Sequence, residues 1–240
     1  IIFNLHRFAS SGIIAALSRA KKSYGFKKNP LSFFYTKSFP HEIGNGLHEV
    51  DRNLSLLAPL KLKSLVRRPS LFPSDKDIKK VSHYKNIPYF CIAPASVWFT
   101  KQLPKEKWIN LIKKLSDKDK VYVLGGPSDY NFCQEIIDAS GVIAENLAGE
   151  LSLLQSAELM KNAERNFVND SGPLHLASAV NANVTAFFCS TTPNFGFGPL
   201  SDDSKTLETE EKLDCRPCGL HGFKACPKGH FKCGAISLTI

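Results

Sequence analysis

Residues 165–176, with the sequence RNFVNDSGPLHL, predict a β-strand that ends in a turn and is followed at once by a helix. Asp170 or Ser171 can cap that helix, and Gly172 lets its backbone come close to a ligand. The first turn of a helix presents unpaired N–H groups and a positive dipole end, which suit a phosphate. His175 follows one turn into the helix. The stretch indicates a phosphate-binding turn, although a capped helix with a partly buried histidine explains the same residues.

The pattern of this stretch recurs along most of the chain. We predict strands at 89–94, 121–124, 142–144, 165–169 and 184–189, and helices at 104–116, 129–139, 151–162 and 173–180. Strands that alternate with helices predict an α/β fold with a parallel sheet, in which ligands bind at the carboxyl ends of the strands. Polar and Gly-rich turns follow four of these strands, at Ala95-Ser96, Gly125-Gly126, 170–172 and 190–192. One sheet edge is therefore expected to collect a phosphate-type site.

The first 74 residues predict a second, smaller part of the chain. We expect strands at 1–5 and 24–26, and helices near 12–20 and 47–57. Pro69 and Pro73 indicate a boundary, so we expect a linker over 58–78 and domains at 1–74 and 75–240. Because the chain begins in strand-like sequence without a Met, we expect it to be a fragment of a longer protein.

The charge of the chain favours anionic partners. Its 31 Lys and Arg residues against 22 Asp and Glu give a net charge of +9. Such an excess suits nucleic acid, a phosphorylated glycolipid or a membrane surface. The chain contains no recognition-helix pattern, no aromatic RNA-binding strand and no basic low-complexity tail, so we do not expect it to bind nucleic acid.

The seven cysteines fall into two groups. Cys91, Cys133 and Cys189 lie singly in apolar contexts and are expected to be buried thiols. The late group, which also has His221 and His230 within its span, consists of Cys215, Cys218, Cys226 and Cys233. The spacing of this group permits two interpretations, a structural zinc site or thiols that pack a loop.

The segment after the first strand of the larger domain carries a small hydroxyl residue and a Lys before a helix that is opened by Pro. The hydroxyl of Ser96 can donate to a phosphate oxygen, and Lys101 is a mobile charge suited to a diphosphate. A surface lysine beside a helix start is the alternative interpretation.

Four motifs in order resemble those of glycosyltransferase family 9, the bacterial ADP-heptose:lipopolysaccharide heptosyltransferases. They are Ser96…Lys101…Pro104…Trp108, Gly125-Gly126-Pro127, DSGPLH at 170–175 and FGFGP at 195–199. The late cysteine pattern is similar to the heptosyltransferase II branch of the family. Residues 4–53 resemble the later part of the family's N-terminal domain, so that domain is expected to be incomplete in this chain.

The resemblance implies a GT-B fold of two Rossmann-like domains with parallel sheets, and an inverting transfer of a heptose-type sugar from ADP to the lipopolysaccharide inner core. By position it implies that Ser96 and Lys101 hold the donor diphosphate and that Asp170 lies near the donor sugar. The remaining donor-site residues implied are Gly125, Gly126, Leu151 at the adenine, and Ser171, Gly172 and His175 in the phosphate-binding turn. The family's transfer is expected to need no metal cofactor. The resemblance further implies a cytoplasmic enzyme at the inner face of the inner membrane.

The catalytic base is expected to precede this chain, because the family carries it after the first strand of the N-terminal domain. His6 and Arg7 follow the first strand seen here and are candidates to face the acceptor phosphates. Two further interpretations stay open. One is a family 9 transferase that uses another nucleotide sugar for a surface polysaccharide, and the other is a non-catalytic protein that binds a nucleotide sugar.

Overall fold

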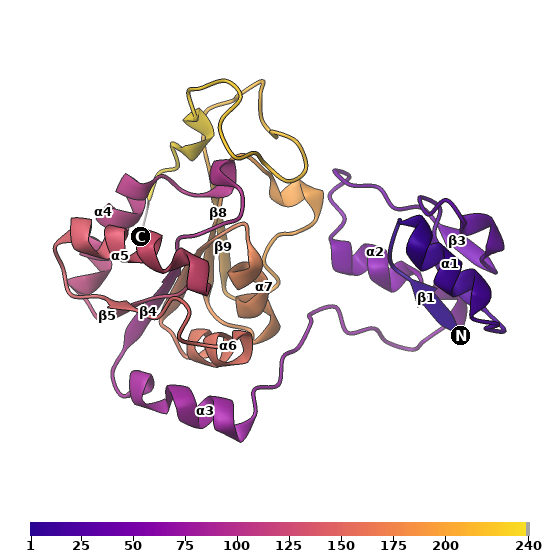
Figure 1. Ribbon diagram of the computed structural model, residues 1–240, viewed down its shortest axis with the longest axis horizontal. Coiled ribbons are helices and arrows are strands. Elements are labelled where there is room, and N and C mark those ends of the chain that lie inside the picture. The colour runs from indigo at the N-terminus through magenta and orange to yellow at the C-terminus, as the bar shows by residue number, and fades with distance from the viewer. Residues whose placement is uncertain (239–240) are drawn as a thin grey trace. The chain divides into compact units, whose positions relative to one another are not determined.

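The computed structural model describes residues 1–238 and divides into two compact units (Figure 1). Unit 1 comprises Ile1–Arg67 together with the short segment Asn194–Phe197. Unit 2 comprises Arg68–Pro193 and the chain from Gly198 onward. The domain boundary at 74/75 remains a sequence-based prediction.

Unit 2 alternates strands and helices, which confirms the predicted α/β class. Its strands are β4 (Tyr89–Ala93), β5 (Lys120–Val123), β6 (Glu145–Asn146), β7 (Arg165–Asn169), β8 (Val184–Phe188) and β9 (Ser204–Glu208). Its helices are α3 (Asp75–Val81), α4 (Lys105–Ser116), α5 (Tyr130–Ser140), α6 (Leu153–Lys161) and α7 (Gly172–Ala179). Each neighbouring pair of strands is parallel.

The strand order of unit 2 determines where a ligand can bind. The order is β6-β5-β4-β7-β8-β9, so the chain winds outward in one direction from β4 and in the other from β7. In an open parallel sheet the loops at such a reversal leave the sheet on opposite sides and form a crevice at its carboxyl edge. The structure therefore places the expected ligand crevice between the ends of β4 and β7.

The helices of unit 2 form because their apolar side chains repeat at helical spacing. In α4, Trp108, Leu111, Ile112 and Leu115 lie on one face and are buried. The Trp108 ring meets Phe187 of β8 edge to face, with 5.2 Å between ring centroids. The interior face of α4 is thereby held against the centre of the sheet.

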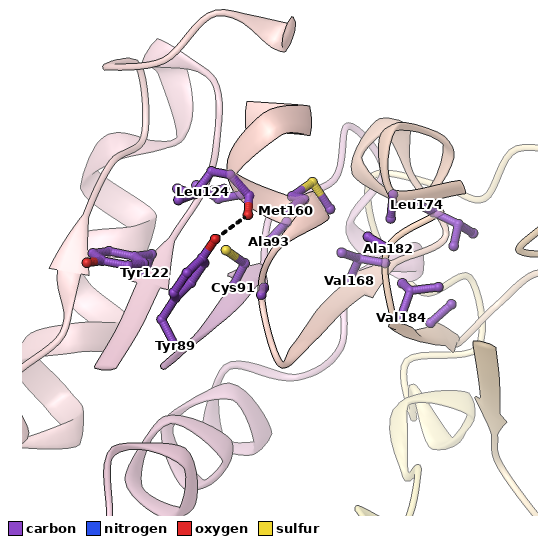
Figure 2. Close-up of a cluster of buried hydrophobic side chains, with 14 of the residues drawn as sticks. Tyr89, Cys91, Ala93, Tyr122, Leu124, Met160, Val168, Leu174, Ala182 and Val184 are labelled. Atoms are coloured by element: carbon purple, nitrogen blue, oxygen red, sulfur yellow. Dashed lines mark hydrogen bonds between the residues drawn. The ribbon is translucent and has the colours of Figure 1, made fainter. Parts of the chain in front are cut away.

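Helices cover both faces of the sheet (Figure 1). Two adjacent residues of β4 pack against different helices, one on each face. Ile92 packs with the side chains of α4 and α5, whereas Cys91 packs with α6 and α7. Figure 2 shows this second cluster, in which the Tyr89 hydroxyl donates to the backbone oxygen of Leu159 at 2.7 Å. Because both faces are covered, the strands are buried and the loops at the carboxyl edge remain for binding.

Three elements of unit 2 differ from the sequence-based expectation. The prediction of a short strand at 142–144 is wrong. The strand that pairs with β5 is β6, which begins three residues later and spans Glu145–Asn146. Strand β9 was not predicted, since Ser204–Glu208 is mostly polar and is an edge strand. Helix α3 begins inside the expected linker, where Ser74 and Asp77 form a capping box.

Unit 1 contains a small parallel sheet in the order β1-β2-β3. Its strands are β1 (Ile2–Asn4), β2 (Ser23–Phe26) and β3 (Lys37–Phe39), and its helices are α1 (Ala9–Leu17) and α2 (Glu49–Ser55). Helix α1 begins earlier than expected, and β3 was not predicted. The parallel order agrees with the expected α/β class.

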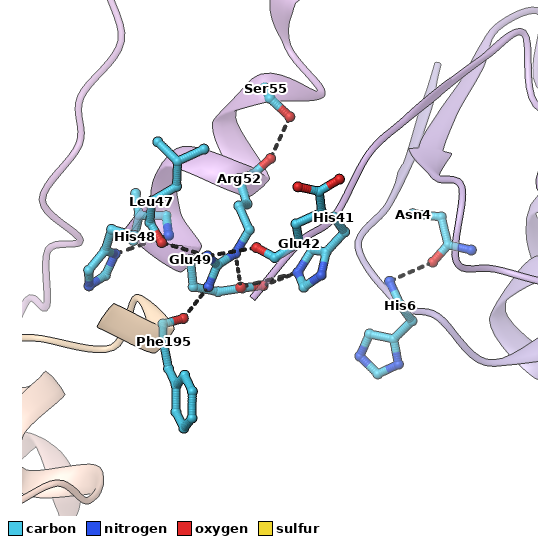
Figure 3. Close-up of polar contacts among 11 residues, drawn as sticks. Asn4, His6, His41, Glu42, Leu47, His48, Glu49, Arg52, Ser55 and Phe195 are labelled. Carbon is cyan, nitrogen blue, oxygen red and sulfur yellow. Dashed lines mark hydrogen bonds and ion pairs between the residues drawn. The ribbon is translucent and has the colours of Figure 1, made fainter. Parts of the chain in front are cut away.

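A buried arginine organises the polar interior of unit 1 (Figure 3). Arg52 is 3% exposed, and its guanidinium donates to the backbone oxygens of Leu47 (2.5 Å) and Phe195 (2.6 Å). Its Nε lies 2.8 Å from Oε2 of Glu49, which also meets His41 at 3.1 Å. These bonds hold the 194–197 segment on helix α2.

We expect Glu49 to make the stability of unit 1 depend on acid pH. Burial raises the pKa of Glu49, but bonds and charges from His41 and Arg52 outweigh it, so the net pKa lies below its ordinary 4.5. A carboxyl with a lowered pKa stabilises the folded state fully above the ordinary value, and this stabilisation is lost as pH falls through the folded pKa. Thermal unfolding from about pH 7 to pH 3 should therefore show an acid-sensitive component that Glu49→Gln removes.

The matched control is Glu42→Gln, which changes an exposed carboxylate of the same unit. That variant should keep the acid-sensitive component. An unfolding profile for Glu49→Gln that parallels the wild type below pH 4.5 would contradict the assignment.

Candidate functional site

Unit 2 contains a pocket of about 810 Å³ at the carboxyl edge of its sheet. The pocket is lined by loops that follow β4, β5 and β7, and by helices α6 and α7. Six residues expected from the sequence are in its lining: Ser96, Gly125, Gly126, Leu151, Ser171 and Gly172. The pocket thus lies at the predicted reversal of strand order between β4 and β7.

The loop after β4 is held by side-chain amides. The Gln102 amide donates to the backbone oxygen of Ser96 at 2.6 Å. Asn169, which is fully buried at the end of β7, donates to the backbone oxygen of Pro94 (2.8 Å) and accepts from the backbone N–H of Leu103 (2.9 Å). One amide therefore joins the end of β7 to both sides of the loop that carries Ser96.

The Gly125-Gly126 turn after β5 is tightly packed. Gly126 donates its N–H to Oδ2 of Asp129 at 2.8 Å. A Cβ at Gly125 would lie 2.9 Å from the Cβ of Asp129 and 3.2 Å from that of Ala148, so a larger residue cannot enter without displacement. Glycine lets this turn line the pocket with backbone.

The turn after β7 leaves the start of α7 open. Ser171 occupies the N-cap position, but within the described residues its side chain makes no capping bond to α7. Its hydroxyl instead donates to the backbone oxygen of Asn169 at 3.4 Å, so the expectation of a side-chain cap was wrong. Gly172 is exposed, and an added Cβ there would meet nothing within 4 Å among the described residues. The first turn of α7 therefore faces the pocket without a side-chain cap.

Part of the pocket lining is apolar. It comprises Leu124, Leu151, Leu153, Met160 and Leu176. The sequence-based interpretation named only Leu151 of this set, because the others belong to helices and strands whose apolar residues look like ordinary core. A lining of this kind suits a flat apolar ring.

Beside the pocket, three buried or nearly buried side chains form a polar cluster. Lys101 Nζ lies 2.8 Å from Oδ2 of Asp170, and the two side chains are 16% and 8% exposed. The Thr191 hydroxyl donates to the same oxygen of Asp170 at 2.6 Å. Lys101 and Asp170, both expected from the sequence, are therefore brought together, although neither is among the described pocket-lining residues. Thr191 was missed, and its only signal was its place in the polar turn after β8.

The three remaining polar candidates are exposed. His175 lies on α7 and is outside the pocket lining. His6 donates its backbone N–H to Oδ1 of Asn4 at 3.0 Å (Figure 3). The Arg7 guanidinium lies 5.8 Å from the centre of the Phe8 ring. The acceptor role of His6 and Arg7 stays a prediction.

The first three cysteines are buried thiols, as expected. Cys91, Cys133 and Cys189 are each free and 1% exposed or less. Burial raises the pKa of Cys133 to about 12 and also raises the pKa values of Cys91 and Cys189. At neutral pH these thiols are protonated and therefore poor nucleophiles.

The late cysteines are also free thiols. Cys233 is buried, and burial raises its pKa to about 11, whereas Cys215, Cys218 and Cys226 are half-buried. Cys215 Sγ lies 3.9 Å from His230 Nε2. In residues 1–238, His, Cys, Asp and Glu form no group of three or more that could hold a metal ion. The zinc interpretation gains no support from this part of the chain.

Comparison with known proteins agrees with this geometry. The model of glycosyltransferase family 9 (heptosyltransferase) matches residues 1–220. Lipopolysaccharide heptosyltransferase 1 of Campylobacter coli is 26% identical over 236 residues, which cover 88% of this chain and 67% of that protein. The chain thus spans about two thirds of the length of this relative.

Two solved structures share the fold. The structure of E. coli ADP-heptose lipopolysaccharide heptosyltransferase II has a TM-score of 0.73 at 20% identity, and the match covers 90% of this chain and 72% of that one. A family 9 glycosyltransferase from Veillonella parvula DSM 2008 has a TM-score of 0.77 at 20% identity, with coverage of 87% and 62%. These matches confirm the parallel α/β architecture of GT-B type, and the chain belongs to glycosyltransferase family 9, the heptosyltransferases.

Proposed function

We propose that the pocket of unit 2 binds an ADP-sugar of the heptose type and that this chain carries the donor site of an inverting transferase of the lipopolysaccharide inner core. The observation that carries the proposal is the composition of the pocket at the β4/β7 crevice. The lining combines serine hydroxyls and an uncapped helix start with a set of apolar side chains. A nucleoside diphosphate has the same division into a charged part and an aromatic part.

The diphosphate is proposed to lie against the turns that carry Ser96, Ser171 and Gly172. Hydroxyls at the first two positions can donate to phosphate oxygens, and the start of α7 adds N–H donors and its positive dipole end. Lys101 is held beside this turn by Asp170, the residue that precedes Ser171. Its ammonium carries three protons, so it can remain on Asp170 and also meet a phosphate oxygen.

The adenine is proposed to pack on the apolar part of the lining, beside Leu151. Burial of an aromatic ring on such a lining contributes to affinity through the hydrophobic effect. Apolar side chains suit purine and pyrimidine alike, so the choice of adenine follows from the ADP-heptose named for a solved structure of the family. A panel of nucleotide sugars tested by thermal shift distinguishes ADP-heptose from the donors of other sugar transferases.

The chemical role of the site is to stabilise the departing nucleoside diphosphate. Negative charge develops on the diphosphate as its bond to the sugar breaks. In this proposal Lys101, held by Asp170, and the N–H groups at the start of α7 are the positive groups that meet this charge, an arrangement that lowers a transition-state barrier. Inversion further requires a base that removes the proton of the acceptor hydroxyl. Asp170 is proposed to lie near the donor sugar and to hold Lys101 in place.

The acceptor is proposed to be a phosphorylated glycolipid at the inner face of the inner membrane. Residues 1–41 contain seven Lys or Arg residues and no Asp or Glu, which favours an anionic partner for unit 1. His6 and Arg7 belong to this basic region. Among the described residues, none of the helices has the length and hydropathy needed to cross a bilayer.

We expect Lys101→Ala to weaken the binding of ADP by roughly 1.5–3 kcal/mol, or about ten- to a hundredfold in Kd. The variant removes a charged contact to the diphosphate and leaves the Asp170 carboxylate close to the incoming anion. Titration calorimetry measures the change.

The matched control is Lys105→Ala. Lys105 also forms an ion pair at 2.8 Å, with Glu135, but the two side chains are 36% and 63% exposed and lie outside the pocket lining. Its loss should leave the affinity for ADP within about twofold of the wild type. Equal affinities for ADP in Lys101→Ala and the wild type would remove Lys101 from the site.

We expect Gly172→Ala to weaken ADP binding while the protein stays as stable as the wild type. An added Cβ meets no described residue, and Ala is preferred over Gly in a helix by up to about 1 kcal/mol, so folding is not impaired. The methyl group would instead meet the phosphate at the start of α7. Calorimetry and thermal unfolding on the same samples separate the two effects.

Gly198→Ala serves as the control for this substitution. Its added Cβ would lie 3.6 Å from the Cβ of Pro193, an ordinary contact, and Gly198 is outside the pocket lining. If Gly172→Ala binds ADP as well as Gly198→Ala does, the phosphate does not lie at the start of α7.

A further inference from the structure

We propose that the 215–223 loop, the first part of the cysteine-rich segment, is a positioning element of the donor site. In this proposal Gly222 fixes Lys101, and Arg216 fixes the turn that carries Thr191. The inference rests on the proposed function, because it assigns the loop to the site in which Lys101 meets a diphosphate. The four ordered motifs of the sequence analysis do not include the loop, and neither does the pocket lining.

The loop is bound to the turn that carries Lys101 by a pair of backbone contacts. Phe223 donates its N–H to the Thr100 hydroxyl at 2.8 Å, and Thr100 donates its N–H to the backbone oxygen of Phe223 at 3.1 Å. The Thr100 side chain is 1% exposed and also lies 3.1 Å from the Ser190 hydroxyl. The residue before Lys101 is therefore held from two sides.

Gly222 lies directly against the stem of Lys101. Its φ of +78° is in the left-handed region that favours glycine. An added Cβ would lie 2.8 Å from Thr100 Oγ1, 3.1 Å from Lys101 Cγ and 3.2 Å from Ser190 Oγ. The backbone of the loop thus takes the place that a side chain would occupy and limits where the Lys101 stem can lie.

Arg216 anchors the other end of the loop to the carboxyl end of β8. Its guanidinium donates to the backbone oxygens of Phe188 (3.0 Å), Cys189 (2.7 Å) and Thr191 (2.7 Å), and it pairs with Glu208 of β9. The fork of an arginine is suited to several acceptors at once. The backbone of Thr191, whose hydroxyl donates to Asp170, is fixed in this way.

The two anchors converge on the same ion pair. Gly222 limits the stem of Lys101, and Arg216 holds Thr191, which orients Asp170 toward Lys101. A lysine has a long flexible stem, so fixing it in advance reduces the entropy lost when the diphosphate binds. The 215–223 loop therefore contributes to donor affinity without touching the donor.

The test compares Gly222→Ala with Gly229→Ala in the full chain of 240 residues. Gly229 has φ of +73°, close to that of Gly222, but an added Cβ there meets nothing within 4 Å among the described residues. Both variants carry similar backbone strain, and only the first crowds the stem of Lys101 together with Thr100 and Ser190. We expect Gly222→Ala to weaken ADP binding about fivefold or more, and Gly229→Ala to match the wild type.

A double-mutant cycle distinguishes positioning from general loss of structure. If Gly222 acts through Lys101, adding Gly222→Ala to Lys101→Ala causes no further loss of ADP affinity. Additive losses would overturn the proposal. If Gly222→Ala fails to fold, Arg216→Lys, which keeps the charge and loses the fork, should weaken ADP binding in the same non-additive way, and unchanged affinity overturns the proposal.

The outcomes also distinguish this inference from the function on which it rests. A wild-type protein that does not bind ADP overturns the proposed function and the inference together. A wild-type protein that binds ADP, with equal affinity in Gly222→Ala, overturns the inference alone and leaves the donor site intact.

Discussion

The buried amide of Asn169 is the interaction on which the pocket of unit 2 depends. It joins the end of β7 to the loop after β4, the two strands between which the sheet order reverses. A buried amide that lost these partners would leave unpaired polar groups on both sides, which costs about 1–3 kcal/mol for each. Together with the pairing of β4 with β7, this side chain fixes how the two loops that carry Ser96 and Ser171 are spaced.

The fold was largely predictable because its signals are local. Alternating apolar runs and turns identified β4, β5, β7 and β8, and helical spacing identified α4. Strand β9 and helix α3 carry few apolar residues, so their formation depends on edge pairing and on a capping box rather than on periodicity. The position of β6 is likewise set by its pairing with β5. The residues of β6 alone do not reveal this pairing.

The site was predictable to a smaller extent, for a related reason. Ser96, the Gly125-Gly126 turn and the Asp170–Gly172 turn each follow a strand, and parallel topology brings such turns to one edge. Arg216 and Gly222, by contrast, contact residues that topology alone does not place beside them. A glycine or an arginine in a cysteine-rich stretch is typical of a surface loop. Its contacts with the site become known only from the structure.

The carboxylate of Asp170 has two partners, Lys101 and the Thr191 hydroxyl, and the second stabilises the buried charge. A lysine that reached for a diphosphate would leave Asp170 buried beside two negative groups, and an unpaired buried charge is costly. The Thr191 hydroxyl also donates to Asp170, so the carboxylate has a second partner besides the ammonium. Arg216 donates to the backbone oxygen of Thr191 and so fixes the residue that makes this second bond. The Lys101 ammonium can therefore donate to a ligand without leaving the Asp170 carboxylate unpartnered. A Lys–Asp pair without the threonine would lack this second partner.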